Sequence, residues 1–145
     1  MNTPLYRTVH LKAVELLKAA EADNDASFDE LYGQLKKLCF DNEGNAELNH
    51  PVQWETLADF TEDQQPALDY YQRALALAEA SGAKDYTASV AFSMASIYEQ
   101  RNDNDQAWLM AQKAAQAATG SIDSELKADI NKLLTALKAR HNSAD

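Results

Sequence analysis

Residues 91–98 read AFSMASIY and residues 107–114 read AWLMAQKA, and these two stretches decide the fold. In both stretches small residues recur at three- and four-residue steps, which places them on one face of a helix. Small residues on facing helices let two backbones approach closely, while large apolar neighbours fill the remaining space. A similar arrangement occurs earlier in the chain, so the pattern predicts two helical hairpins. The residues concerned are Trp54, Leu57, Ala58, Ala67, Tyr71 and Ala74 in the first copy, and Ala91, Met94, Ala95, Tyr98, Ala107, Ala111 and Ala114 in the second.

The composition favours an all-α fold in a single domain of 145 residues, with only four glycines and three prolines. A chain of this length buries about 68–70 % of the surface that its unfolded form exposes. Cys39 is the only cysteine, and the first residues lack a basic flank followed by an apolar run. We therefore expect a cytoplasmic protein. No apolar stretch reaches the roughly 18 residues that a membrane span requires.

Apolar periodicity and punctuating residues predict seven helices. Pro51 and Pro66 suit the first turns of two helices, and Gly82 and Gly120 suit the positions after the last turns of two others. The expected ranges are 4–21, 27–40, 51–60, a fourth helix through Pro66 to residue 81, 85–101, 105–119 and 121–141. The last helix carries an apolar stripe of Ile122, Leu126, Ile130, Leu133, Leu134 and Leu137.

Negative charge is concentrated in one part of the chain. The net charge is −10, and residues 21–63 carry twelve acidic residues against two lysines, whereas residues 1–20 carry a net charge of +2. An electrostatic field of this sign repels phosphate groups and anionic lipids. The charge therefore disfavours direct binding to nucleic acid or to a membrane.

The hairpin pattern resembles the tetratricopeptide repeat, a 34-residue helical hairpin in which W-x2-L-G-x2-Y is followed by A-x3-F and a late proline. The resemblance is clearest over residues 51–119. It implies a right-handed α–α superhelix of about three hairpins. These are a degenerate hairpin at 4–40, a first repeat at 51–80 and a second repeat at 85–119, followed by a capping helix at 121–141.

Two features depart from the family pattern. The gap from Ala58 to Ala67 is three residues shorter than the pattern's equivalent, so we expect the helix at 51–60 to be stunted. Thr119 stands at the place of the late proline in the second repeat. The array is therefore expected to be less regular than that of the family.

The resemblance also implies a partner-binding groove. In tetratricopeptide folds the first helix of each hairpin lines a concave surface that holds a peptide or a helix of another protein. Three of the matching residues are the carboxylates Glu55, Asp59 and Glu99, which would repel a partner's C-terminal carboxylate. The resemblance therefore favours a basic or amphipathic segment, with Phe92 as the residue that anchors its apolar side. The matching residues are Val52, Glu55 and Asp59 in the first repeat, and Ser89, Phe92, Ser96 and Glu99 in the second.

Catalytic and metal-binding motifs are weak in this sequence. His10, His50 and His141 have no second metal ligand at helical spacing, and a Cys39–His50 nucleophile pair is the one catalytic arrangement to consider. We therefore expect a non-catalytic protein-interaction module that needs no cofactor and no metal. Two alternatives stay open. The chain could be a self-assembling structural or regulatory subunit whose first hairpin pairs with another copy, or an acidic decoy that occupies a nucleic-acid-binding protein.

Overall fold

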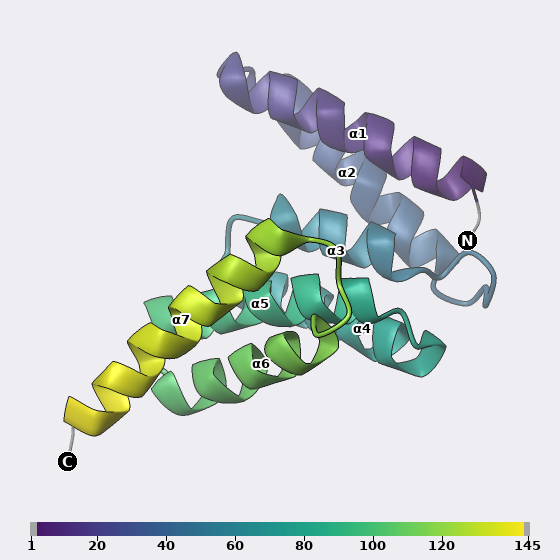
Figure 1. The fold of residues 1–145 in the computed structure, drawn as a ribbon. Coiled ribbons are helices and arrows are strands. Elements are labelled where there is room, and N and C mark those ends of the chain that lie inside the picture. Colours follow the sequence, from purple (N-terminus) through teal and green to yellow (C-terminus); the bar gives the residue numbers. More distant parts are fainter. Residues whose placement is uncertain (1–2, 144–145) are drawn as a thin grey trace. The chain divides into compact units, whose positions relative to one another are not determined.

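The structure is a computed structural model that describes residues 3–143, and this part of the chain consists of seven α-helices without a strand (Figure 1). The all-α prediction and the number of helices are confirmed. α3 has nine residues and is the shortest helix, as its shortened gap predicts. Within this range no helix is both long and apolar enough to traverse a lipid bilayer. The helices are α1 (Thr3–Glu21), α2 (Asp25–Asn42), α3 (Pro51–Asp59), α4 (Gln64–Ser81), α5 (Lys84–Gln100), α6 (Asn104–Ala117) and α7 (Ser124–Ser143).

Three turns between consecutive helices share one left-handed backbone conformation. Asp23, Gly82 and Asn102 follow α1, α4 and α5 and have φ values of +53°, +70° and +59°. Each turn satisfies a carbonyl at the end of a helix, and Asp and Asn tolerate this conformation better than other side chains do. The stop at Gly82 is as predicted. The other two turns lie between predicted helices, as expected, but the left-handed conformation of Asp23 and Asn102 was not foreseen. The closing N–H···O bonds, all 2.9 Å long, are Asn24 to Ala19, Ala83 to Ala78, and Asp103 to Tyr98.

The boundaries near the C-terminus differ from the prediction. α6 ends at Ala117, and Gly120 does not adopt a positive φ, so it is not a left-handed stop. α7 begins only at Ser124, because the Asp123 side chain caps it by accepting a hydrogen bond of 3.0 Å from the N–H of Leu126. Ile122 therefore precedes the helix and is fully exposed, so its place on the apolar stripe was predicted wrongly.

The chain divides into two compact units, residues 1–77 and residues 78–145, and their boundary falls within α4. The first unit contains α1, α2, α3 and most of α4. The second contains the end of α4 together with α5, α6 and α7. The assignment of the whole chain to one superhelical domain therefore stays a prediction.

The core of the first unit lies where α1, α2 and α3 meet. α1 and α2 form a hairpin, and α3 contacts both of them (Figure 1). Three leucines, one from each helix, have no exposed surface: Leu16, Leu35 and Leu57. The buried Gln53 side chain accepts a hydrogen bond of 3.1 Å from Asn42. This bond satisfies a buried amide, which would otherwise destabilise the core.

An aromatic cluster joins α2, α3 and α4 in the first unit. The ring centroids of Phe40, Trp54 and Tyr70 lie between 5.2 and 6.3 Å apart. The Arg73 guanidinium lies 5.2 Å from the centroid of Phe40 and 4.8 Å from that of Trp54, and it forms an ion pair with Glu43. These contacts bury Tyr70, which lies off the clearest apolar stripes of the sequence.

Alanines bring α5 and α6 together in the second unit. Ala95, Ala107 and Ala111 have no exposed surface and form a cluster with Leu133 and Leu137 of α7. Methyl groups at a helix crossing permit a close approach of the backbones, and the leucines of α7 cover the remaining apolar face. The predicted apolar stripe of the last helix is therefore confirmed from Ile130, which is also buried, to Leu137.

The hairpin signature read from the sequence lies in the core. Twelve of its thirteen residues are buried, and Tyr98 is half-buried. The spacing that suggested close helix packing thus selects residues that are removed from water.

Candidate protein-binding site

The residues of the predicted groove lie on two helices that belong to different units. Val52, Glu55 and Asp59 lie on α3, and Ser89, Phe92, Ser96 and Glu99 lie on α5. Val52 is buried, which leaves little of its side chain for a partner. Phe92 is half-buried against the alanine cluster, and the Ser96 hydroxyl donates a hydrogen bond of 3.1 Å to the Phe92 carbonyl. The groove itself therefore stays a prediction.

Asp59 has a polar partner inside its own unit. The Tyr71 hydroxyl donates a hydrogen bond of 2.5 Å to the Asp59 carboxylate. Although part of Asp59 reaches solvent, its carboxylate is crowded by protein atoms, and this burial raises its pKa more than the bond from Tyr71 lowers it. A carboxylate with these properties is a weaker attractor of basic segments than a fully hydrated one.

Glu99 is also paired. Its carboxylate lies 2.9 Å from the guanidinium of Arg140 on α7, and 26 % of the Glu99 side chain is exposed. An ion pair of this kind stabilises a fold by only about 0–1 kcal/mol, but it neutralises the charge that a partner would meet. The carboxylates of Asp59 and Glu99 therefore both have partners within the chain.

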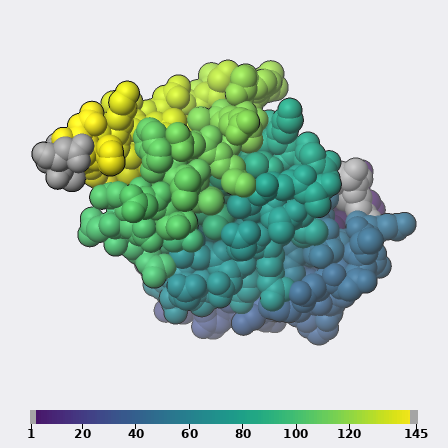
Figure 2. All heavy atoms as spheres, turned by 90° about the horizontal axis from the view of Figure 1, so that it is seen from below, coloured from purple at the N-terminus to yellow at the C-terminus, as the bar shows by residue number. Residues whose placement is uncertain are grey.

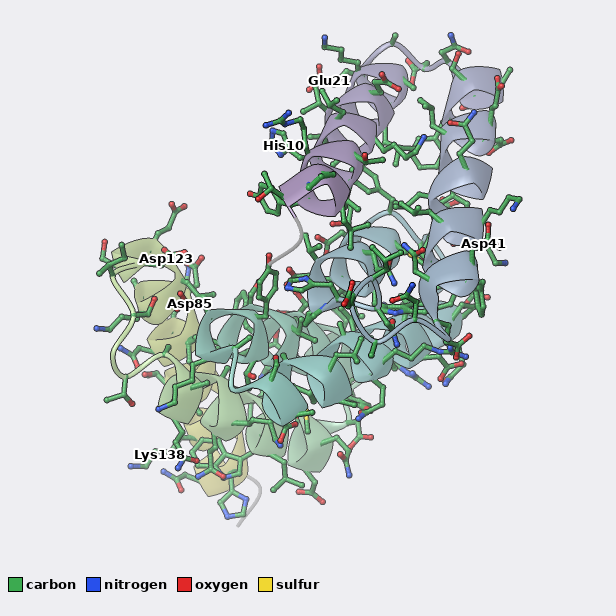
Figure 3. All side chains as sticks on the ribbon, turned by 90° about the vertical axis from the view of Figure 1, so that its right-hand side faces the viewer. His10, Glu21, Asp41, Asp85, Asp123 and Lys138 are labelled. Carbon is green, nitrogen blue, oxygen red and sulfur yellow. The ribbon has the colours of Figure 1, made fainter. Side chains whose placement is uncertain are left out.

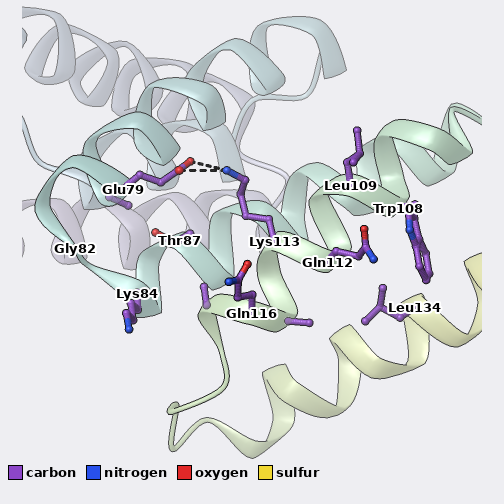
Figure 4. Close-up of a pocket in the computed structure, with 13 residues that line it drawn as sticks. Glu79, Gly82, Lys84, Thr87, Trp108, Leu109, Gln112, Lys113, Gln116 and Leu134 are labelled. Carbon is purple, nitrogen blue, oxygen red and sulfur yellow. Dashed lines mark hydrogen bonds and ion pairs between the residues drawn. The ribbon is translucent and has the colours of Figure 1, made fainter.

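An open groove crosses α6 in the second unit (Figure 4). Its volume is about 970 Å³, and it runs between the end of α4, the start of α5, α6 and Leu134 of α7. In the space-filling view the green atoms of α6 reach the surface beside the yellow-green atoms of α7 (Figure 2). We call this feature the α6 groove and define it by Glu79, Gly82, Trp108, Leu109, Gln112, Lys113, Gln116 and Leu134.

The α6 groove has an apolar end and a polar end. Trp108, Leu109 and Leu134 form the apolar end, where 53 % of Leu109 is exposed. Towards the other end the Lys113 ammonium group donates hydrogen bonds of 3.0 and 3.1 Å to the Glu79 carboxylate (Figure 4). These opposite charges cancel along that wall. The apolar end can therefore hold a partner's hydrophobic side chain without a strong preference for either sign of charge.

Two glutamines lie between these ends. Gln112 and Gln116 are exposed and stand one helical turn apart on α6. Each side-chain amide offers both donors and an acceptor, which are the groups that a peptide backbone needs. By helical rise, Trp108 and Gln116 are about 12 Å apart along the axis of α6. That length accommodates about two helical turns of a partner.

A smaller notch of about 700 Å³ adjoins the same ridge of α6. It shares Trp108 and Leu109 with the α6 groove and adds Leu137, Lys138 and His141 of α7. The side chains of Trp108 and Leu109 therefore contribute to both depressions. A partner bound at one of them contacts the rim of the other.

The sequence did not single out Trp108 or Leu109, although a signal is present. Alanines at 107, 111 and 114 occupy the face of α6 that packs in the core. Successive helical residues differ by about 100° in direction, so Leu109, two residues after Ala107, has to project away from that face, whereas Trp108 lies at its edge and is half-buried against the alanine cluster. Large apolar residues next to an alanine stripe could therefore have indicated an exposed ridge.

Cys39 and His50 do not form a nucleophile pair. The Cys39 thiol donates a hydrogen bond of 3.3 Å to the Gln53 carbonyl, and its burial raises the pKa to about 12. His50 caps α3 by accepting a hydrogen bond of 3.1 Å from the N–H of Val52 through its Nδ1 atom. A thiol with this pKa stays protonated near neutral pH and is a poor nucleophile. Among residues 3–143 no three His, Cys, Asp or Glu side chains are grouped so that they could hold a metal ion.

The functional assignment of this chain depends on the geometry given above. No protein-family model matches the sequence, and a search of curated proteins finds no significant match.

Proposed function

We propose that this protein is a non-catalytic interaction module that binds an amphipathic segment of a partner protein in the α6 groove. The observation that carries the proposal is the apolar end of this groove, where Leu109 is 53 % exposed beside Trp108 and Leu134. Exposed apolar side chains in a concave, polar-rimmed surface are typical of binding sites. A hydrophobic residue of the partner is expected to occupy this end, with its backbone or polar side chains near Gln112 and Gln116.

A tetratricopeptide-like architecture is part of the proposal. The burial of the hairpin signature and the close alanine contact of α5 with α6 support it. Helical repeats commonly bind other proteins along their helices, because each repeat presents side chains at regular intervals. The single cysteine, buried as a thiol, suits a reducing compartment such as the cytoplasm.

The acidic residues that the sequence predicts for a groove, on α3 and on α5, are the competing candidates. They favour a basic segment, but Asp59 is bonded to Tyr71 and Glu99 is paired with Arg140. These internal partners lower the attraction that a basic segment would experience. The α6 groove is therefore the preferred site.

Affinity capture with matched variants tests the proposal. Immobilised parent protein and the variants Leu109→Glu and Gln112→Arg are exposed to an extract of the source cells, and the retained proteins are quantified by mass spectrometry. Ile122→Glu is the control for Leu109→Glu. It also replaces an exposed aliphatic side chain of the second unit with a carboxylate, but Ile122 lies outside the groove. We expect a specific set of proteins to be lost from both groove variants and kept by the control.

A second comparison separates the two surfaces. A variant with Glu55, Asp59 and Glu99 all changed to Lys should retain the same proteins as the parent if the α6 groove is the site. Loss of binding from this variant alone would assign the function to the acidic surface. If the immobilised parent protein retains no protein above the level of a blank resin, the proposal of an interaction module is contradicted.

A further inference from the structure

α1 carries two apolar stripes, of which only one is buried. Leu5, Val9 and Leu16 point into the core of the first unit. The next residue after each of these three is Tyr6, His10 or Leu17, so these residues form a second stripe with the same spacing. Tyr6 is 43 % exposed and Leu17 is 52 % exposed. In Figure 3 the labelled His10 projects from the side of α1 that faces away from α2. We call this second stripe the exposed stripe; it consists of the exposed Tyr6, His10, Leu17 and Ala20, with the half-buried Ala13 at its centre.

The exposed stripe has the spacing of a coiled-coil seam. Its members follow one another at steps of four, three, four and three residues, which is the heptad repeat that keeps one face of a helix towards a partner helix. The Tyr6 and His10 rings stack with their planes 6° apart and their centroids 6.2 Å apart, so this end of the stripe has an ordered surface. A single helix of matching pattern is the occupant that this spacing suits.

The order of residues along the stripe is self-complementary. If a second α1 lies antiparallel across the first with Ala13 at the centre, Tyr6 lies opposite the partner's Ala20, and His10 lies within one residue of the position opposite the partner's Leu17. The large ring thus meets a small residue at each end, and two alanines meet in the middle, where the backbones come closest. Alternation of large and small side chains across a helix pair is the condition for close packing.

The charges beside the stripe support the same alignment. Arg7, Val14 and Glu21 follow the stripe on its outer flank at seven-residue intervals. With Ala13 at the centre, the partner's residue 19 lies opposite Arg7, so the partner's Glu21 is displaced from Arg7 by two residues, about 3 Å along the axis. The long side chains of Arg7 and Glu21 span this offset at both ends of the pair. Arg7 and Glu21 are both exposed, and neither forms an ion pair with another residue of the described range. In a parallel alignment the two copies of this flank lie on opposite sides of the helix pair, so Arg7 and Glu21 do not meet.

The distribution of charge over the chain makes α1 the most suitable face for self-association. Residues 21–63 carry a net charge of −10, so two copies repel each other strongly through most of the first unit. Residues 1–20 carry a net charge of +2. Of the twelve acidic residues at 21–63, only Glu21 belongs to α1, so a contact through α1 brings few like charges together.

We propose that α1 forms an antiparallel, two-fold symmetric contact with α1 of a second copy through Tyr6, His10, Ala13 and Leu17. Such isologous pairing is the commonest symmetry of homodimers. A helix of 19 residues is about 28 Å long, and one helix pair buries less than the roughly 1,200–2,000 Å² of a stable complex. The dimer is therefore weak and depends on protein concentration.

Sedimentation velocity of the full chain from about 5 μM to 1 mM tests this contact. Arg7→Glu and Glu21→Arg each replace two attractive pairs with two repulsive ones, so each variant should raise the dimer Kd at least about tenfold. An equimolar mixture of the two variants restores opposite charges at both ends and should dimerise like the parent. The double variant with both changes should do so as well. Circular dichroism and thermal melting check that every variant is folded.

A matched pair of leucine variants locates the contact on the helix. Leu17→Glu should abolish dimerisation. Leu11→Glu is the control, since Leu11 is 55 % exposed, about as much as Leu17. Leu11 lies on another face of α1, so its variant should dimerise like the parent. A parent that stays monomeric at 1 mM would overturn the proposal. The proposal would also be overturned if Arg7→Glu dimerised like the parent, or if the mixture of the two charge variants formed no more dimer than either variant alone.

Discussion

The phenol of Tyr71 on α4 donates a hydrogen bond of 2.5 Å to the carboxylate of Asp59, the last residue of α3. This bond joins two consecutive helices of the first unit. Burial raises the pKa of Asp59, and the bond from Tyr71 lowers it by less, so the pKa stays above its ordinary value of 3.8. The folded protein therefore holds a proton on Asp59 more tightly than the unfolded chain does.

Asp59→Asn should stabilise the fold at neutral pH. A carboxyl group whose pKa is raised on folding contributes stability that is present below its unfolded-state pKa and lost as the pH rises through the folded-state pKa. Asparagine keeps an acceptor for Tyr71 but never ionises. Thermal melting between pH 4 and pH 8 should show a higher Tm for the variant at pH 7 and a difference that narrows on acidification. Glu62→Gln, at an exposed site nearby, is the control. A variant that is less stable than the parent at every pH would contradict the assignment.

His50 should make the stability of the first unit pH-dependent in the opposite sense. Burial lowers the pKa of His50, and the cap of α3 requires a neutral Nδ1 acceptor. Its contribution is therefore present above the unfolded-state pKa of about 6.5 and lost as the pH falls through the folded-state pKa. His50→Ala should cost about 1 kcal/mol of unfolding free energy at pH 7.5 and less at pH 5.

His50→Asn separates capping from titration at this position. Asparagine caps helices without ionising near neutral pH, so this variant should be as stable as the parent at pH 7.5 and more stable than it at pH 5. Urea unfolding at the two pH values measures the difference. The exposed His141, changed to Asn, should alter stability by no more than about 0.5 kcal/mol at either pH. Equal losses for His50→Ala at both pH values would exclude the proposed titration.

Ala95→Leu and Ala107→Leu should each destabilise the protein by about 1–3 kcal/mol. Both methyl groups are completely buried where α5 meets α6, so three additional carbons have no space there. Ala128→Leu on α7 introduces the same side chain at an exposed place and serves as the matched control. Chemical unfolding of all three variants gives the comparison. Unchanged stability at both buried sites would refute the close crossing of these helices.

Deletion of residues 121–145 should expose the apolar face of α6 that α7 covers. Leu133 and Leu137 shield Ala107 and Ala111, and without them this face contacts water. We expect the shortened protein to aggregate or to bind a hydrophobic dye, as large exposed apolar patches do. Light scattering and dye fluorescence, compared with the full chain, measure this. If the shortened protein stays monomeric and unfolds cooperatively, α7 is not a capping helix.

Helix positions were accessible to sequence analysis because they depend on local patterns. Pro51, Pro66 and Gly82 act through their own backbone restrictions, and the alanine spacing of α5 and α6 repeats over several turns. The start of α7 was misplaced because Ile122 continues the apolar period, whereas the capping bond of Asp123 determines the boundary. A local hydrogen bond therefore prevailed over periodicity.

The candidate site was less accessible, because it depends on which side chains the fold leaves uncovered. The ion pair of Glu99 with Arg140 joins residues on α5 and α7, and no local pattern connects them. The α6 groove likewise requires the relative positions of α4, α5, α6 and α7 within the second unit. Sequence spacing predicted the acidic surface through a family resemblance, but it could not show that two of its carboxylates have internal partners.

Cys39 provides the chain with an intrinsic reporter of local opening. It is the only thiol, it has no exposed surface, and its high pKa keeps it protonated while α2 and α3 are in contact. Alkylating reagents react with the thiolate, so modification requires that these two helices first separate. The rate of labelling, compared with that of a free thiol, therefore measures the free energy of opening in the first unit without any introduced probe. The same measurement across the variants above would separate changes that loosen this unit from changes confined to the other.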